Sequence, residues 1–199
     1  MAGQALIVID MQYDFCPGGA LAVPGGDAII PAINRLIAGH AHVVMTQDWH
    51  PAGHSSFASS HAGKAPFDMI EMPYGPQTLW PDHCVQGSRG AAFHDALEWT
   101  KAELVIRKGF RREIDSYSAF FENDHATPTG LGGYLRERGI DRVTLCGLAT
   151  DFCVAFSAID AARHGLSATV ILDACRGIDL GGSMAAMMEK MKAEGVTLA

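Results

Sequence analysis

Three side chains that could take part in covalent chemistry, Asp10, Lys108 and Cys153, each follow an apolar stretch of the sequence. The thiolate is the nucleophilic form of cysteine, and a helix N-terminus or a nearby lysine ammonium favours it. A carboxylate beside the thiol can take its proton and later pass it to a leaving amine. We therefore expect Cys153 to be a nucleophile, Asp10 to be its acid and base, and Lys108 to stabilise the charges of both.

Each of these residues also has an ordinary interpretation. A cysteine on a helix is usually a buried core residue, and a lysine at the end of a strand usually lies on the surface. The position of all three after separate strands favours the chemical interpretation, because the carboxyl ends of parallel strands meet at one edge of a sheet. If the three side chains meet there, their protonation belongs to the cluster and not to one residue.

A second set of residues is typical of a metal site. Asp48 and His50 are separated by one residue, so their side chains point the same way in an extended segment. We expect His83 to add a third ligand and the ion to be zinc, with iron or manganese as alternatives. His54 and His61 are candidates for a further ligand, although ordinary loop residues are the simpler interpretation.

Large apolar side chains lie near these groups in the sequence, namely Phe15, Leu21, Trp80 and Tyr117. Simple packing would explain them. They would also suit an apolar slot in which a flat substrate ring stacks. We therefore expect these four residues to line a substrate pocket.

Short β-rich runs alternate with helical patterns along the chain. The expected strands are Ala5–Ile9, His42–Thr46, Glu103–Arg107, Arg142–Cys146, Ala168–Leu172 and Val196–Leu198. The expected helices are Asp27–Ala38, Leu131–Arg138, Phe152–His164 and Gly182–Ala193. Continuous apolar strands that alternate with helices predict an α/β fold with three layers, α/β/α, around a mostly parallel sheet of about six strands.

Two local predictions concern the segments around the site. We expect Thr150 or Asp151 to cap the helix that carries Cys153, and backbone N–H groups there to form an oxyanion hole. The stretch from Pro51 to Ser88 lacks clear periodicity, and loops of this length in compact domains are usually functional or disordered. Trp80 argues against disorder, so we predict a functional loop.

Composition limits the class of protein. The chain has 199 residues, of which 48% are hydrophobic, and its net charge is −7. We expect one domain, residues 1–199, and no binding to nucleic acid or to an anionic membrane, because such binders are usually basic. The five cysteines form no CxxC pair, and the N-terminus shows no signal peptide, so we expect free thiols in the cytoplasm.

The order of these motifs carries a family resemblance that covers nearly the whole chain. It rests on Leu6–Leu21, Thr46–Pro51, Trp80–Gly87, Lys108–Gly109, Asp115–Phe120, Cys146–Val154 and Asp173–Gly177. Together these stretches resemble the nicotinamidases (pyrazinamidases) of the isochorismatase-like cysteine hydrolase superfamily. The resemblance implies an isochorismatase-like fold and hydrolysis of nicotinamide to nicotinate and ammonia, in the recycling of NAD, with activity on pyrazinamide as well.

The resemblance also implies roles for single residues. Cys153 would form a thioester, and the N–H groups of Ala149 and Cys153 would form the oxyanion hole beside a cis peptide between Leu148 and Ala149. The metal at Asp48, His50 and His83 would bind the pyridine nitrogen. Monomers and homodimers are both consistent with the sequence.

Other functions are compatible with parts of the pattern. A related cysteine amidohydrolase acting on a carbamoyl or ureido substrate would share Asp10, Lys108 and Cys153, so the metal-binding residues and Trp80 distinguish the two. A non-catalytic binding protein is disfavoured because the three catalytic candidates are intact. A vinyl-ether hydrolase such as isochorismatase is disfavoured because that activity does not need the cysteine.

Overall fold

The computed structural model describes residues 3–199, and its main feature is a six-stranded sheet. The strand order is β5-β2-β1-β6-β7-β8, and every neighbouring pair in this sheet is parallel. The strands are β1 (Gly3–Ile9), β2 (His42–Asp48), β5 (Leu104–Lys108), β6 (Ile140–Leu148), β7 (Ser167–Arg176) and β8 (Thr197–Leu198). The predicted parallel sheet of about six strands is confirmed.

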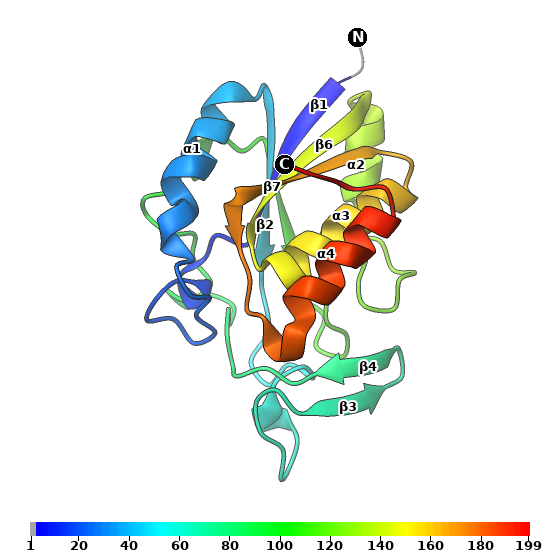
Figure 1. The fold of residues 1–199 in the computed structure, drawn as a ribbon. Helices are drawn as coiled ribbons and strands as arrows, with labels where there is room; N and C mark the ends of the chain where they lie inside the picture. Colours follow the sequence, from blue (N-terminus) through cyan, green and yellow to red (C-terminus); the bar gives the residue numbers. More distant parts are fainter. Residues whose placement is uncertain (1–2) are drawn as a thin grey trace.

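Helices cover both faces of the sheet, so the fold has the predicted three layers (Figure 1). The four α-helices are α1 (Ile30–Gly39), α2 (Leu131–Glu137), α3 (Ala155–Arg163) and α4 (Ser183–Ala193). Figure 1 shows α1 on one side of the sheet and α3 and α4 on the other. The central strand β1 is packed from both sides, and its residues from Ala5 to Ile9 are completely buried, which explains why that run is apolar without alternation.

The long stretch from Pro51 to Ser88 contains regular structure that its sequence does not predict. Two short strands, β3 (Met69–Met72) and β4 (Gly75–Thr78), pair antiparallel as a hairpin that projects from the main body (Figure 1). Most of the hairpin is exposed or half-buried, so it has no continuous apolar run to reveal it. Strand β4 begins directly after the tight connection, at Gly75, whose φ is 113°.

Several expected strands end too early, and the expected helix cap is wrong. Neither Thr150 nor Asp151 caps the helix that carries Cys153, because that segment begins with a π-helical turn, Thr150–Val154, without a side-chain cap. The Asp151 carboxylate instead accepts hydrogen bonds from the backbone N–H of Ile178 and the hydroxyl of Ser183. Strand β7 has the largest difference, since it continues past the expected end at Leu172 to Arg176.

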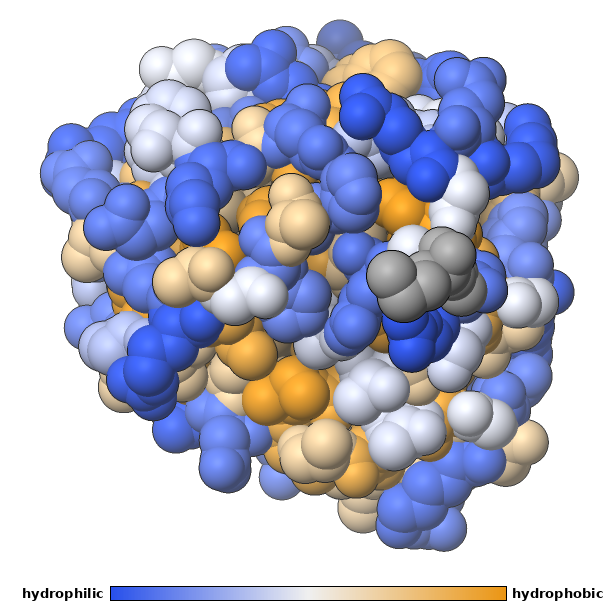
Figure 2. All heavy atoms as spheres, turned by 90° about the horizontal axis from the view of Figure 1, so that it is seen from above, coloured by the Kyte–Doolittle hydropathy of each residue, from blue (hydrophilic) through white to orange (hydrophobic). Residues whose placement is uncertain are grey.

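The end of the molecule where the strands begin lies far from the predicted site. Figure 2 shows this end from above, where hydrophilic residues predominate and hydrophobic residues appear between them. None of the helices within residues 3–199 is long and apolar enough to cross a membrane.

Candidate active site

The three predicted catalytic side chains meet at the carboxyl ends of three parallel strands. Asp10 directly follows β1, Lys108 is the last residue of β5, and Cys153 lies in the turn after β6. The Lys108 ammonium nitrogen, Nζ, is 2.7 Å from Asp10 Oδ2 and 3.4 Å from Cys153 Sγ. All three residues are buried. The structure therefore brings together three groups that are far apart in the sequence.

Lys108 is a buried cation surrounded by hydrogen-bond acceptors. Besides Asp10, its ammonium contacts Asp48 Oδ1 at 2.5 Å and donates to the backbone carbonyl of Ser116 at 3.1 Å. Burial by itself would lower the pKa of Lys108, but the carboxylates of Asp10 and Asp48 outweigh burial and hold that pKa well above its usual value. Lys108 is therefore positively charged and compensates the charges on both carboxylates.

Asp10 and Cys153 both hold a proton more readily than they would in water. Burial raises the pKa of the Asp10 carboxyl although Lys108 opposes it, and burial also raises the pKa of the Cys153 thiol well above its usual value. Thr46 donates a 2.6 Å hydrogen bond to Asp10 Oδ1. Apart from its contact with Lys108, Asp10 Oδ2 has no hydrogen-bond partner within residues 3–199. Oδ2 is thus available to accept the thiol proton.

The turn that carries Cys153 has an irregular backbone. The peptide bond between Leu148 and Ala149 is cis, as the family resemblance implies. The backbone N–H of Ala149 makes no hydrogen bond to any other described residue, and Ala149 and Cys153 line the same cavity. An unpaired N–H group beside a nucleophile can stabilise an oxyanion.

A second cluster adjoins the first through Asp48, the last residue of β2. Asp48 Oδ2 is 3.2 Å from His50 Nε2 and 3.4 Å from His83 Nε2, and the three residues can offer ligand atoms that all lie within 4.8 Å of one another. Burial would raise the pKa of Asp48, but Lys108 and His50 outweigh burial and lower it well below its usual value. Asp48 is therefore ionised, as a metal ligand must be.

Backbone carbonyls orient both histidines of this cluster. His50 Nδ1 is 2.9 Å from the carbonyl oxygen of Gly109, and His83 Nδ1 is 2.8 Å from that of Pro81. Each contact favours a proton on Nδ1 and leaves the lone pair of Nε2 directed toward Asp48. Metal-bound histidines usually donate their second nitrogen in this way. The residues present therefore fit a divalent metal ion held by one oxygen and two nitrogens.

Replacing Gly109 by alanine is expected to lower metal affinity about 10- to 100-fold, the usual effect of disturbing an outer-shell partner of a metal ligand. A Cβ atom at Gly109 would lie 2.4 Å from Cε1 of His50, so the ring would have to move. Competition with a chelator measures the affinity. The matched control is Gly63→Ala, because Gly63 has a similar positive φ but no atom within 4 Å of the added carbon. Equal affinity in both variants would contradict the expectation.

The two candidates for a further metal ligand lie outside the group formed by Asp48, His50 and His83. His54 packs against His50 with 4.4 Å between ring centroids, but its Nε2 faces the carbonyl of Arg111 at 2.9 Å. His54 instead belongs to a separate potential ligand group with His50 and Asp115. The Nε2 of His61 faces the carbonyl of Ser55 at 2.7 Å.

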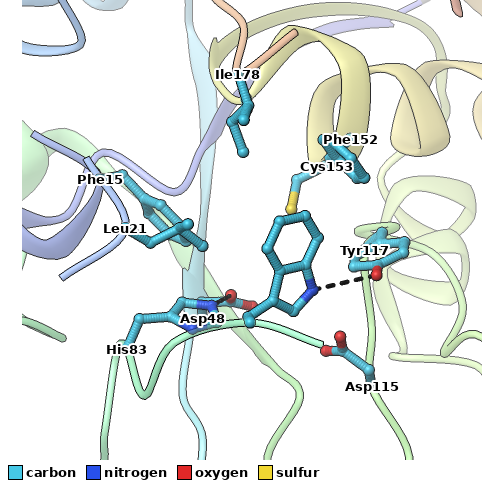
Figure 3. A pocket seen from close by; sticks show the side chains of 11 residues that line it. Phe15, Leu21, Asp48, His83, Asp115, Tyr117, Phe152, Cys153 and Ile178 are labelled. Atoms are coloured by element: carbon cyan, nitrogen blue, oxygen red, sulfur yellow. Dashed lines mark hydrogen bonds and ion pairs between the residues drawn. The ribbon is translucent and has the colours of Figure 1, made fainter. Parts of the chain in front are cut away.

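The four predicted pocket residues line one cavity, of about 320 Å³ when the open space at its mouth is included. They are Phe15, Leu21, Trp80 and Tyr117. Figure 3 shows Cys153 on one side of this cavity, with Asp48 and His83 across from it. The nucleophile candidate and two of the three metal-ligand candidates, Asp48 and His83, therefore face one aromatic cavity from different sides.

Three further residues line the cavity that the sequence did not single out, Asp115, Phe152 and Ile178. Phe152 directly precedes Cys153, and its place beside the predicted nucleophile could have identified it as a pocket residue. Ile178 carried no such signal, because its place depends on the hydrogen bond from its N–H to Asp151.

The unpredicted hairpin also contributes to the cavity wall. The side-chain amide of Gln77, on β4, is 3.0 Å from Asp115 Oδ2 and 3.0 Å from the Tyr117 hydroxyl. The indole N–H of Trp80, just after β4, donates to the same hydroxyl at 3.2 Å. Two cavity residues from a distant part of the chain, Asp115 and Tyr117, are thus held by Gln77 of the hairpin and by Trp80.

Comparison with known proteins places the chain among amidases. A curated nicotinamidase of Acinetobacter baylyi is 59% identical over 192 residues, covering 96% of this chain and 90% of that protein. A curated nicotinamidase of Escherichia coli is 47% identical over 205 residues, covering 100% of this chain and 95% of that protein. The solved nicotinamidase/pyrazinamidase of Acinetobacter baumanii superposes with a TM-score of 0.98 at 55% identity and covers 100% of this chain and 96% of that one.

Two more distant solved structures contain a bound group. PnC1 of L. infantum in complex with nicotinate has a TM-score of 0.86 at 41% identity, covering 100% of this chain and 92% of that one. Pyrazinamidase of Pyrococcus horikoshii in complex with zinc has a TM-score of 0.78 at 37% identity, covering 98% of each chain. The family model described as the isochorismatase domain matches residues 4–199. The chain therefore belongs to the isochorismatase family.

Proposed function

We propose that this chain is a nicotinamidase, an amidohydrolase that converts nicotinamide to nicotinate and ammonia. The observation that carries the proposal is the shared cavity, which has Cys153 on one side and the pair Asp48 and His83 on another. In the proposed function, a flat ring that carries a carboxamide lies between them, with the carboxamide at the thiol. The curated relatives at 59% and 47% identity support the same activity.

The first half of the reaction forms a covalent intermediate. Asp10 takes the proton of the Cys153 thiol, and the sulfur attacks the carboxamide carbon to form a C–S bond. The N–H groups of Ala149 and Cys153 stabilise the resulting oxyanion. Asp10 then passes the proton to the leaving nitrogen, the C–N bond breaks, and ammonia departs from a thioester.

The second half of the reaction releases the acid. Asp10 takes a proton from a water molecule that attacks the thioester carbon, the C–S bond breaks, and the proton returns to the sulfur. Throughout both halves, Lys108 keeps its positive charge between Asp10 and Asp48. The charge of the buried cluster is therefore always partly compensated, which lowers the cost of forming a thiolate inside the protein.

Substrate orientation is assigned to the other walls of the cavity. Asp48, His50 and His83 would hold one divalent metal ion, and when bound the ion supplies a Lewis acid for the pyridine nitrogen. We propose zinc, which the relative from Pyrococcus horikoshii binds, with iron and manganese as alternatives. Phe15, Leu21, Trp80 and Tyr117 pack against the ring. Pyrazinamide presents a ring nitrogen in the same way, so it is proposed as a second substrate.

The cellular setting is also part of the proposal. We place the reaction in the cytoplasm, as a step in the recycling of NAD, and assign it to one domain that spans residues 1–199. All five cysteines are free and buried, which suits a reducing compartment.

The test is release of ammonia and nicotinate from nicotinamide by the zinc-loaded protein. We expect both products in equal amounts, measured by a coupled ammonia assay and by chromatography, and a lower rate with acetamide, which has no ring to fill the cavity. No ammonia above background from nicotinamide, together with turnover of a carbamoyl or ureido compound, would contradict the proposal and favour the alternative amidohydrolase.

A further inference from the structure

Gln12 is a buried side chain with no role in the reaction described above, and its contacts are unusual. Its amide nitrogen donates to the backbone carbonyl of Asp48 at 2.8 Å and to that of Ala91 at 2.9 Å, and its amide oxygen accepts from the backbone N–H of Asp48 at 2.8 Å. The side chain is completely buried. Both donors and the acceptor of the amide are therefore used, and two of the three bonds go to Asp48.

These bonds to Gln12 take the place of hydrogen bonds that a neighbouring strand would make to the backbone of Asp48. The last backbone pair between β1 and β2 is Val8 with Met45, three positions before Asp48. On the other side of β2, Asp48 still pairs with Lys108 of β5. The Gln12 amide thus takes the place of a neighbouring strand beside Asp48, beyond the point where β1 has ended.

The position of the Asp48 backbone matters because its carboxylate serves two clusters at once. Oδ1 is 2.5 Å from Lys108 Nζ, while Oδ2 is 3.2 Å from His50 Nε2 and 3.4 Å from His83 Nε2. A small rotation or shift of Asp48 would disturb both sets of contacts together. No other side chain within residues 3–199 hydrogen-bonds to the backbone of Asp48.

We propose that Gln12 is a positioning residue that sets the orientation of the Asp48 carboxylate. It thereby fixes the position of the metal ligands relative to the Lys108–Cys153 pair. The inference rests on the proposed function, in which these two clusters act on opposite ends of one substrate. It assigns Gln12 no contact with substrate or metal. Its effect passes through the backbone of Asp48.

A purely structural role is the competing explanation, and Gln47 provides a matched control. Gln47 is also buried, directly precedes Asp48, and also donates to the carbonyl of Ala91, at 2.8 Å. Its amide oxygen accepts from Arg107, so it makes no hydrogen bond to Asp48. Gln12→Met and Gln47→Met therefore remove comparable buried amides, but only the first removes the bonds to Asp48.

The experiment compares the two variants by three measurements besides turnover. These are the rate of Cys153 alkylation by iodoacetamide in metal-free protein, the zinc affinity by chelator competition, and the thermal unfolding midpoint. The alkylation measured in the same variants with Cys153→Ala added is subtracted, which removes the contribution of the other thiols. We expect Gln12→Met to lose about 10- to 100-fold in zinc affinity and about tenfold in alkylation rate, since the ammonium beside the thiol would be displaced. Gln47→Met should change each by less than about twofold at a similar loss of thermal stability.

Equal effects of the two variants on alkylation and zinc affinity, or a loss in Gln12→Met that is confined to thermal stability, would overturn the inference. The alkylation measurement needs neither metal nor nicotinamide. If the proposed function is wrong, the wild-type protein releases no ammonia from nicotinamide. The alkylation measurement still tests the role of Gln12 in that case, so the two failures can be distinguished.

Discussion

Cys153→Ala is expected to reduce ammonia release from nicotinamide to background, a loss of at least about 10⁴-fold, because removal of a nucleophile eliminates the covalent route. The same variant should retain the divalent metal in full. Cys153 Sγ contacts Lys108, whereas the three metal-ligand candidates gather around the other oxygen of Asp48. Ammonia assays and metal analysis of the purified protein give the two results.

Cys146→Ala is the control for loss of a buried thiol. Cys146 is fully buried in β6 but does not line the cavity, so that variant should keep its turnover at a temperature where it is folded. A metal content near zero in Cys153→Ala would show that the thiol organises the metal site, and the separation of the two clusters would be wrong.

Lys108→Met is expected to lower the free energy of unfolding by about 3–5 kcal/mol, because it leaves buried carboxylates without their cation. The carboxylates are those of Asp10 and Asp48, at 2.7 Å and 2.5 Å from the ammonium. Turnover should be lost even where the variant is folded, since nothing then offsets the charge of a Cys153 thiolate. Urea unfolding and the rate of thiol alkylation measure the two effects.

The control for this variant is Lys101→Met, at an exposed lysine, which should change the free energy of unfolding by no more than about 0.5 kcal/mol. If Lys108→Met were as stable as the wild type, Asp10 and Asp48 would have to be neutral when the lysine is absent. If it also kept its activity, the assignment of Lys108 to the reaction would be wrong.

The sequence predicted the sheet well because its strands are buried on both faces. Runs such as Ala5–Ile9 are apolar without interruption, and a chemically active residue directly after such a run stands out. The same rule predicts that Asp10, Lys108 and Cys153 lie at one edge of the sheet, as the structure shows. The rule works because parallel strands share the direction of their carboxyl ends.

The features that could not be predicted depend on contacts between distant segments. Asp151 looked like a helix cap, but it binds the loop that carries Ile178. Gln77 lies in the stretch Pro51–Ser88, which was predicted to be a loop, but it is on a hairpin and contacts Asp115 and Tyr117. In each case, the local sequence is compatible with several partners, and only the assembled fold selects one.

The aromatic cavity of the proposed nicotinamidase also bears on the choice between the free base and the pyridine nucleotides. In NAD the ring nitrogen is bonded to ribose, so it has no lone pair for the metal ion that we propose at Asp48, His50 and His83. The carboxamide is the same in both molecules, so Cys153 alone could not distinguish them. In the proposed function, discrimination would therefore come from Asp48 and His83, on the side of the cavity across from the thiol, and nicotinamide would be degraded without consumption of the coenzyme.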